Sequence, residues 1–451
     1  MVVGGLLRGW AASWGFISDE ICWLFNGGVY TNWAAGETAV NPPAIRMVLA
    51  AITTDHWQIA HMGRAWSFAA GTGAIGLMFW LGRLVGNNKN LPGFLAASYL
   101  TVLPLAIQQA GQFRSYATLV FVLTWHLIAL VKVVDGWKGP PRRSWVGHLV
   151  VSAALLPQVH YTGVAVVFLE GLTFAVWLRD RRFLRYYVPA ALLFAPLGYR
   201  IVTETNEHLA PDVDRLQNLA MLFQVVLHHP FLTVLVVLGW IRFQGRQRIL
   251  LLGAVSSAGG LIAVASYHLA RPDLGIIPTT YQIPLMATLP LVIPTTTTAG
   301  TLGRVVAWIA MLGAFLLVAV DGYSRQLRGP RAHDGPPLMA RDVQAGHWPS
   351  DRPTYLYPPS TVQPVHFYLK YRRLLDNCPT DEGPFCFEYR GRLFTRFNER
   401  DIPSSYVVLF SVDGQEERFA DQCRLARAQP TYWVWDCPNG WKAPVKRRGS
   451  P

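Results

Sequence analysis

Charge is scarce in this sequence. Charged residues make up 15% of the 451 residues, whereas hydrophobic residues make up 51%. A soluble protein of this length would carry about 25% charged residues, so the composition excludes an ordinary soluble enzyme. The mean hydropathy of +0.24 points the same way. No internal repeat is found.

Long apolar runs dominate the chain up to Asp321 and are missing after it. Runs of roughly 18 to 23 residues are long enough to cross a bilayer of about 30 Å. They predict an α-helical polytopic membrane protein with about eleven transmembrane helices. The expected spans lie near residues 2–17, 63–83, 92–110, 115–134, 145–159, 161–178, 186–203, 218–241, 249–268, 280–299 and 304–321.

The net charge of +13 is explained by position, without a nucleic-acid partner. One alternating set of connections holds most of the cations, such as Lys89 and Arg181, and the other set holds most of the acids, such as Glu20 and Glu204. Cationic connections stay on the cytoplasmic side. We therefore predict a multi-pass protein of the bacterial cytoplasmic membrane, surrounded by membrane lipids, with its N-terminus inside and its C-terminus outside.

Cysteine is rare and concentrated near the C-terminus. Cys378, Cys386, Cys423 and Cys437 all lie in the segment that the topology places outside, where an oxidising compartment favours disulfides. Four cysteines allow three pairings, of which we favour Cys378 with Cys386 and Cys423 with Cys437. A zinc site is the alternative interpretation, but no Cys-x-x-Cys spacing is present.

The expected organisation has three parts. Residues 1–322 form a membrane-embedded catalytic domain with a long outer loop at 18–62, residues 323–359 form a proline-rich linker, and residues 360–451 form a small extracytoplasmic mixed α/β domain with a basic tail. β-branched and aromatic residues predict strands in that last domain; they lie at 365–369, 385–394, 406–412 and 432–434. The first span contains Arg8, and no small-residue cleavage site follows it, so we do not expect a cleaved signal peptide.

Polar residues gather at three predicted outer junctions. Asp19 and Glu20 are adjacent carboxylates at the end of the first apolar stretch, where they are costly near lipid unless they serve a function. The second junction runs from Gln112 to Tyr116. Its Arg114 stands at a helix start, where an arginine suits a phosphate. The third junction is His160-Tyr161.

Each of these features also has an ordinary interpretation. Asp19 and Glu20 could begin a solvated loop, Arg114 could snorkel to the membrane surface, and His160-Tyr161 could belong to an interfacial aromatic belt. Asp55 is a candidate pocket residue, although a helix cap is the more common role for such an aspartate. Glu170 falls in mid-span, where an interhelical hydrogen bond is the simplest explanation.

The order of motifs resembles the GT-C class of integral-membrane glycosyltransferases, in particular the bacterial relatives of protein O-mannosyltransferases and of the lipid A aminoarabinose transferase. An Asp-Glu pair opens the first outer loop in that class. The further matches, over about residues 10 to 320, are Asn41-Pro42-Pro43 for His-Pro-Pro, Arg64-Ala65-Trp66-Ser67 for Arg-x-x-Ser, Gln112-Phe113-Arg114-Ser115-Tyr116 for Glu-Ala-Arg-x-Tyr, His160-Tyr161 for His-Tyr and Thr280-Tyr281 for Arg-Tyr. Asn41, Gln112 and Thr280 depart from the pattern.

The resemblance implies a polyprenyl-phosphate sugar donor, a lipid, glycan or protein acceptor, and inverting transfer on the outer face. It implies Asp19 as general base, Glu20 as a residue that orients substrate or a divalent metal, and Arg114 with Arg64 on the donor phosphate. The remaining pocket-lining candidates are Asn41, Asp55, Gln112, Tyr116, His160, Tyr161 and Tyr281. No cofactor is assigned with certainty, and a divalent metal at Asp19 and Glu20 stays open.

Two other functions stay open. A lipid or polysaccharide flippase would need polar or broken helices near the bilayer midplane, often as paired repeats, and the charges here lie at the outer boundary. A catalytically inactive scaffold is compatible with the three departures from the motifs.

Overall fold

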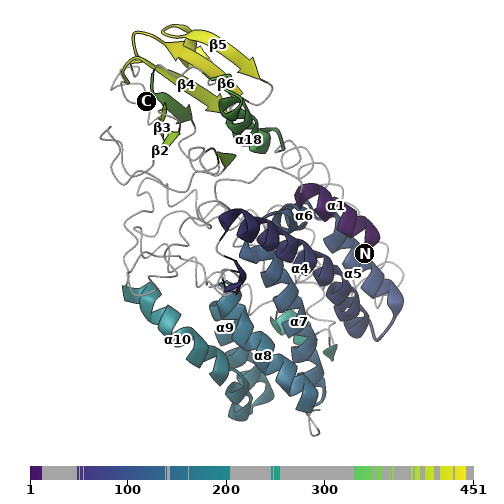
Figure 1. The fold of residues 1–451 in the computed structure, drawn as a ribbon. Helices are drawn as coiled ribbons and strands as arrows, with labels where there is room; N and C mark the ends of the chain where they lie inside the picture. The colour runs from purple at the N-terminus through teal and green to yellow at the C-terminus, as the bar shows by residue number, and fades with distance from the viewer. Residues whose placement is uncertain are drawn as a thin grey trace, which may run out of the picture. The chain divides into compact units, whose positions relative to one another are not determined.

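The computed structural model describes residues 1–12, 48–49, 51–53, 55–137, 139, 143–160, 162–203, 245–246, 248–253, 330–348, 352–357, 365, 368–369, 387–389, 392–396, 402–410, 417–429 and 432–442. These residues belong to two compact units, a helical one before residue 254 and a sheet-containing one after residue 329 (Figure 1). The predicted spans at 218–241, 280–299 and 304–321 lie outside the described residues, as does most of 249–268. The expected number of spans therefore stays a prediction.

The helical unit follows the predicted spans in the part of the chain that is described. Its elements are α1 (Val2–Ala12), α4 (His56–Val85), α5 (Asn90–Val102), α6 (Pro104–Gly111), α7 (Ser115–Asp135), α8 (Arg143–Val159), α9 (Thr162–Leu178), the 3₁₀ helix η2 (Arg181–Tyr186) and α10 (Val188–Thr203). Two helices, in Trp57–Val85 and Ser115–Asp135, are long and apolar enough to cross a membrane, and Thr162–Leu178 is a shorter apolar helix.

The predicted span at 92–110 consists of two helices, α5 and α6, that meet at Leu103 and Pro104. Proline has no backbone N–H, so the carbonyl of Leu100 lacks its usual partner four residues on. The buried side chain of Arg8 supplies one, because its Nη2 donates to Leu100 O at 2.9 Å and its Nη1 donates to Thr101 O at 3.4 Å. Arg8, which interrupts the first apolar stretch, thus supplies hydrogen bonds to the backbone carbonyls at the break between α5 and α6.

Glycines allow a close approach between the backbones of α4 and α5. A Cβ placed on Gly82 would lie 2.8 Å from Pro92 O, and one on Gly93 would lie 2.5 Å from Phe79 O. Small residues at such crossings let backbones approach, which is how helices associate where lipid removes the usual hydrophobic driving force.

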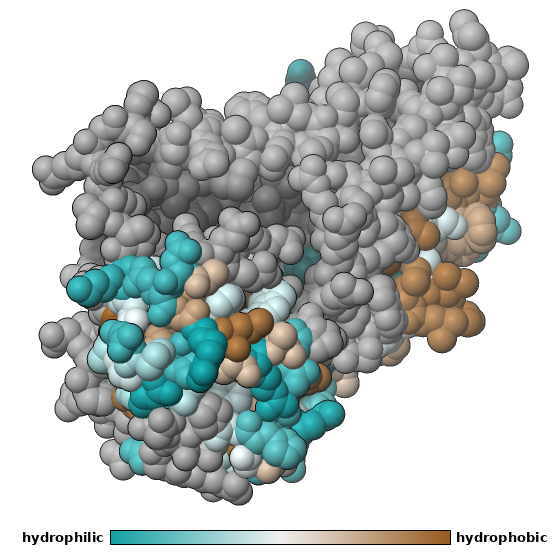
Figure 2. Space-filling view, turned by 90° about the horizontal axis from the view of Figure 1, so that it is seen from above, coloured by the Kyte–Doolittle hydropathy of each residue, from teal (hydrophilic) through white to brown (hydrophobic). Residues whose placement is uncertain are grey.

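Large apolar side chains are exposed on the helical unit. Phe168, Val176 and Leu192 are each 69% exposed, and in the described part of the sheet unit Leu425 is the only large hydrophobic residue of this kind, at 46%. Figure 2 shows brown, hydrophobic residues on the described surface alongside areas that are mainly hydrophilic. An exposed apolar surface of this kind marks contact with lipid or a partner.

The sheet unit contains a six-stranded mixed sheet with strand order β2-β3-β1-β4-β6-β5. Its elements are α18 (Pro330–Gln344), β1 (Thr354–Tyr357), β2 (Phe387–Tyr389), β3 (Arg392–Arg396), β4 (Ser405–Phe410), the short helix α20 (Glu417–Ala420), β5 (Arg424–Gln429) and β6 (Tyr432–Cys437). Strand β1 is parallel to β3 and to β4, and the other pairs are antiparallel.

Both faces of this sheet are covered. Every residue of β4 is buried: Val408 and Phe410 pack with Met339 of α18, while Val407 and Leu409 pack in a second cluster on the other side of the strand. Because side chains alternate between faces along a strand, the continuous apolar run of β4 fits a central position in the sheet.

Several sequence-based expectations for this unit need correction. Leu369 N donates to Val365 O at 3.0 Å, a helical bond, so the predicted strand at 365–369 is wrong: β-branched content does not outweigh local hydrogen bonding. Helix α18 and strand β1 occupy the segment predicted as linker, although α18 contains Pro336 and Pro337. The predicted strand at 385–394 is a hairpin of β2 and β3, and those at 406–412 and 432–434 correspond to β4 and β6.

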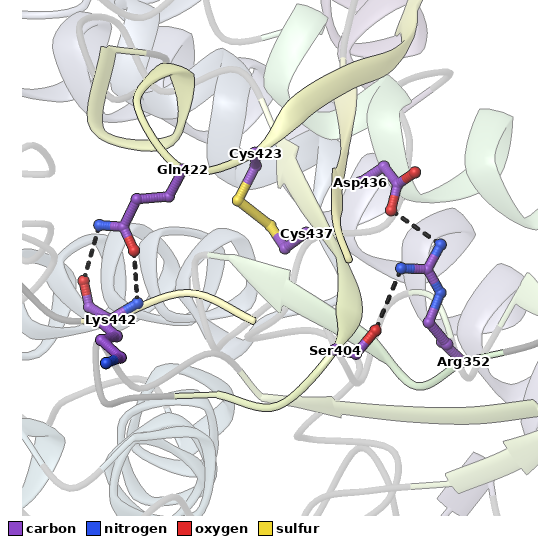
Figure 3. The surroundings of a disulfide bond; sticks show 7 residues. All are labelled: Arg352, Ser404, Gln422, Cys423, Asp436, Cys437 and Lys442. Carbon is purple, nitrogen blue, oxygen red and sulfur yellow. Dashed lines mark hydrogen bonds and ion pairs between the residues drawn. A yellow bond between two sulfur atoms is a disulfide. The ribbon is translucent and has the colours of Figure 1, made fainter. Parts of the chain in front are cut away.

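The disulfide between Cys423 and Cys437 is confirmed (Figure 3). It joins the turn before β5 to the end of β6, with a Cα–Cα distance of 4.4 Å. Next to it, Gln422 and Lys442 exchange two hydrogen bonds, of 3.0 and 2.7 Å. Cys378 and Cys386 lie outside the described residues, so their pairing stays a prediction.

Candidate functional site at one end of the helical unit

Helix α4 packs its N-terminal half against the junction between α6 and α7. Ser67 Oγ donates to the backbone oxygen of Arg114 at 3.3 Å, and Trp66 Nε1 donates to Thr118 Oγ1 at 3.0 Å. Two of the motifs identified in the sequence, Arg-x-x-Ser and the segment around Arg114, are therefore in direct contact.

Arg64 connects this region to the end of α1. Its Nη1 donates to the carbonyl oxygen of Ala12 at 3.1 Å, and its side chain is only 7% exposed. A cation at the C-terminal carbonyls of a helix is stabilised by the helix dipole. Since Ala12 ends α1, Arg64 fixes the point from which the chain continues toward Asp19 and Glu20.

Arg114 directly precedes α7 and adopts an extended backbone conformation at the N-cap position. Its guanidinium carbon lies 5.6 Å from the centre of the Tyr116 ring. The first N–H groups of a helix together with a planar guanidinium form a favourable environment for a phosphate. The predicted helix-start position of Arg114 is thus what the structure shows.

His160 completes the cluster from the junction between α8 and α9. The residue is fully buried, its Nδ1 lies 2.9 Å from Thr162 Oγ1, and its ring centre lies 5.2 Å from that of Tyr116. Tyr116 therefore stands between the cationic Arg114 and the imidazole of His160. We name Arg64, Ser67, Arg114, Tyr116 and His160 the outer cluster.

The predicted site residues are placed as follows. Gln112 is buried in the α6–α7 junction, beside the outer cluster. Asp55 instead caps α4, accepting a hydrogen bond from Trp57 N at 2.9 Å, and it stands about 13 Å from Arg64 along that helix at 1.5 Å per residue. Outside the described residues lie Asp19, Glu20, Asn41, Tyr161 and Tyr281. No group of three His, Cys, Asp or Glu side chains that could hold a metal occurs in the described part of the chain.

A small, mainly apolar cavity lies beside the outer cluster, and sequence reasoning missed it. Arg8, Gln109 and Tyr116 contribute to its lining, and it has room for about one water. Arg8 Nε and Gln109 Oε1 are buried without a hydrogen-bond partner among the described residues. Arg8 and Gln109 are about 100 residues apart in the sequence, and only the packing of α1 against α6 brings them together. No local sequence pattern could therefore have predicted this cavity.

Glu170 belongs to a separate network inside the bundle. His126 Nε2 lies 2.5 Å from Glu170 Oε1, Tyr187 Oη donates to the same oxygen at 2.9 Å, and His126 Nδ1 lies 2.9 Å from Ser152 Oγ. The side chains of His126 and Glu170 are fully buried. The expectation of an interhelical hydrogen bond is confirmed, and the partners come from α7, α8 and the residue that precedes α10.

The connections at the other end of the helices also contact one another. Arg246 Nε pairs with Asp135 Oδ2 at 2.7 Å, and Arg246 Nη1 donates to Leu84 O at 3.4 Å. Trp137 packs against Phe183, with ring centres 5.3 Å apart. The predicted inner connections therefore contact one another at one end of the bundle, and the predicted outer junctions contact one another at the other.

The chain has the fold of a solved membrane enzyme. It is similar to the crystal structure of ArnT from Cupriavidus metallidurans in the apo state, with a TM-score of 0.56, 11% identity and coverage of 95% of both chains. The crystal structure of the same protein bound to undecaprenyl phosphate gives a TM-score of 0.54 and 12% identity, covering 100% of this chain and 98% of that one.

The resemblance to GT-C glycosyltransferases is confirmed at the level of the fold, because ArnT is one of them. No known family profile matches the sequence, and no curated protein matches it. The fold is thus a helical membrane region followed by a mixed C-terminal sheet.

Proposed function

We propose that this chain is a membrane glycosyltransferase that moves one sugar from a polyprenyl-phosphate carrier to a lipid, glycan or protein acceptor on the outer face of the cytoplasmic membrane. The observation that carries the proposal is the outer cluster, in which motif segments far apart in the sequence meet at one end of the bundle. The fold shared with ArnT, which was solved with undecaprenyl phosphate bound, supports the choice of donor.

The proposed chemistry begins at Asp19. Its carboxylate accepts the proton of the acceptor hydroxyl, whose oxygen attacks the anomeric carbon of the donor. The bond from that carbon to the phosphate oxygen breaks, and the bonding electrons leave with the lipid phosphate. Attack opposite the leaving group inverts the anomeric centre. Glu20 orients the substrate or a divalent metal.

Arg114 holds the leaving phosphate in this proposal. A fixed cation aimed at developing negative charge lowers the barrier most when it is already in place. The guanidinium of Arg114 lies over the ring of Tyr116, and Ser67 donates a hydrogen bond to the backbone oxygen of Arg114. Arg64 is a second candidate for the phosphate, although its bond to Ala12 O also gives it a structural role.

The test replaces Asp19 by Asn and follows sugar transfer. A deletion strain is first analysed for the one sugar missing from its glycans and lipids, and the variants are then asked to restore it. We expect Asp19→Asn to abolish transfer with normal expression, a loss of at least about 100-fold for a general base. Asp55→Asn is the matched control, because Asp55 caps α4 and is expected to leave transfer intact.

A second measurement uses undecaprenyl phosphate itself as the probe. Arg114→Ala should weaken its binding to the purified chain, and Arg114→Lys should restore part of it, because a lysine keeps the charge but not the bidentate fork. Transfer at the wild-type rate by Asp19→Asn would remove this residue from the mechanism, and equal binding by Arg114→Ala would remove the phosphate role.

A further inference from the structure

A cationic turn connects α9 and α10 at the end of the bundle opposite the outer cluster. It contains Arg179, Arg181, Arg182 and Arg185, and we name residues 179–186 the arginine turn. The four arginines and Asp180 leave a net charge of +3 on this turn. In the sequence these arginines indicate only the orientation of the chain in the membrane, and the proposed reaction does not use them.

The turn is well defined in its backbone. Arg179 takes a left-handed conformation with φ of 53°. Arg179 N donates to Val176 O at 3.2 Å, and Asp180 N donates to Ala175 O at 3.1 Å, which is how a helix C-terminus is closed. Asp180 then caps η2 by accepting from Arg182 N at 2.9 Å.

Two aromatic residues anchor the turn in the bundle. Residues three apart lie on the same face of a 3₁₀ helix, and the buried pair Phe183 and Tyr186 occupies one face of η2. Both rings contact Trp137, at 5.3 and 6.1 Å between centres. The other face is left to exposed residues, namely Arg181, Arg182, Leu184 and Arg185.

Exposed apolar residues adjoin the arginines on both sides. Val176 and Trp177, in the last turn of α9, are 69% and 40% exposed, and Val188 and Leu192 of α10 are 49% and 69% exposed. A soluble acidic protein or a nucleic acid would leave this apolar belt in water. An amphiphile with a negative head and apolar chains satisfies both parts of the surface.

We infer that the arginine turn binds the phosphate headgroups of anionic phospholipids, whose acyl chains lie along α9 and α10. The predicted topology places the turn on the cytoplasmic side, where the leaflet is negatively charged. Asp180 pairs with Arg182 at 2.7 Å and so reduces the pull of that arginine. Arg179, Arg181 and Arg185 form no ion pair within the described part of the chain, and Arg185 donates to the neutral Tyr186 Oη at 3.1 Å. Of these three, Arg181 and Arg185 lie on η2 and are the pair chosen for the test.

The experiment titrates phosphatidylglycerol or phosphatidylcholine into the purified full chain in neutral detergent and follows the midpoint of thermal unfolding. Phosphatidylglycerol should raise the midpoint at lower concentration than phosphatidylcholine. Each arginine near an anionic surface is worth about fivefold in affinity. The double variant Arg181→Gln and Arg185→Gln should therefore need about thirtyfold more phosphatidylglycerol to reach the same rise in the unfolding midpoint.

The control is Arg341→Gln with Lys442→Gln, which removes two exposed charges from the sheet unit and should respond as wild type. If the double variant does not fold, the inference is tested on the wild type alone. Raising NaCl from about 0.05 M to about 0.5 M should then reduce the rise in unfolding midpoint that phosphatidylglycerol causes, because salt screens the charges. Equal stabilisation by both lipids, insensitivity to salt, or a wild-type response of the double variant would each overturn the inference. None of these outcomes depends on sugar transfer.

Discussion

The helical unit and the sheet unit expose different kinds of side chains. The helical unit leaves Phe168, Val176 and Leu192 mostly exposed, whereas the described part of the sheet unit keeps its large apolar residues inside, apart from Leu425. A protein in water is stabilised when its apolar side chains are buried away from the solvent. A helix in lipid gains no such stability from burying them, because the lipid tails are themselves apolar. We therefore expect lipid around the described helices of the first unit and water around the described part of the second.

The two units also differ in how deeply some of their paired ionisable side chains are buried. In the helical unit Glu170 and His126 are fully buried and bonded to each other. In the sheet unit Arg352 pairs with Asp436 at 2.8 Å and Arg427 pairs with Asp342 at 2.9 Å, and all four side chains keep some exposure. Where water is excluded, every polar group must find its partner inside the protein.

Removing Glu170 should have the largest effect. Glu170→Ala leaves His126 and Tyr187 buried without their shared partner, and breaking such a pair costs about 3 to 5 kcal/mol. Glu170→Gln keeps hydrogen bonding and should cost far less. Both are measured by denaturant unfolding of the full chain in detergent. If the two variants unfolded alike, the network would not stabilise the bundle.

A charge introduced on each exposed surface tests the solvent assignment directly. Phe168→Lys places a cation in the middle of α9, where membrane insertion costs about 2.5 to 3.5 kcal/mol more. Leu425→Lys changes an exposed strand position in water and should stay within about 0.5 kcal/mol of wild type. Membrane yield and thermal midpoint are the readouts. Comparable losses from both substitutions would contradict a lipid-facing α9.

The disulfide should matter to one unit only. Replacing Cys423 and Cys437 by Ser opens a loop that spans 14 positions, and a loop of this size is worth about 3 kcal/mol. Trypsin should then cleave the sheet unit of the full chain sooner, with no change in the thermal midpoint of the helical unit. The control, Gln422→Ala, removes the neighbouring bonds to Lys442 and keeps the disulfide. A change in the helical unit would show that the units are not independent.

The smallest effect concerns Tyr432 and alkaline pH. Burial, together with the hydrogen bond to Asp342, raises the pKa of Tyr432 above its usual value. A raised pKa stabilises the folded state below the unfolded value of about 10, and this stabilisation is lost as the pH rises through the folded pKa. Below pH 10 the free energy of unfolding of the wild type should exceed that of Tyr432→Phe by about 1 kcal/mol. Above pH 10 this difference should disappear. A margin independent of pH would exclude the linkage.

Some of the site could be predicted because its signals are local. The helix start at Arg114, the cap at Asp55 and the mid-span position of Glu170 each follow from a few neighbouring residues, and the structure agrees with all three. The strand predicted at 365–369 was wrong and β1 and β5 were missed, because propensity in short segments yields to packing. The roles of Asp19 and Glu20 stay predictions from the motif order.

Local sequence indicates which stretches of this chain are apolar enough to enter lipid, where α7 begins and that cysteines gather in the final part. These properties depend on residues within one or two turns of each other. The packing of distant segments, in contrast, brings Arg8 to the carbonyl of Leu100, Arg64 to Ala12, and β1 between β3 and β4. Such partners are separated by tens of residues, and a buried polar group is matched by whatever the packing brings within reach.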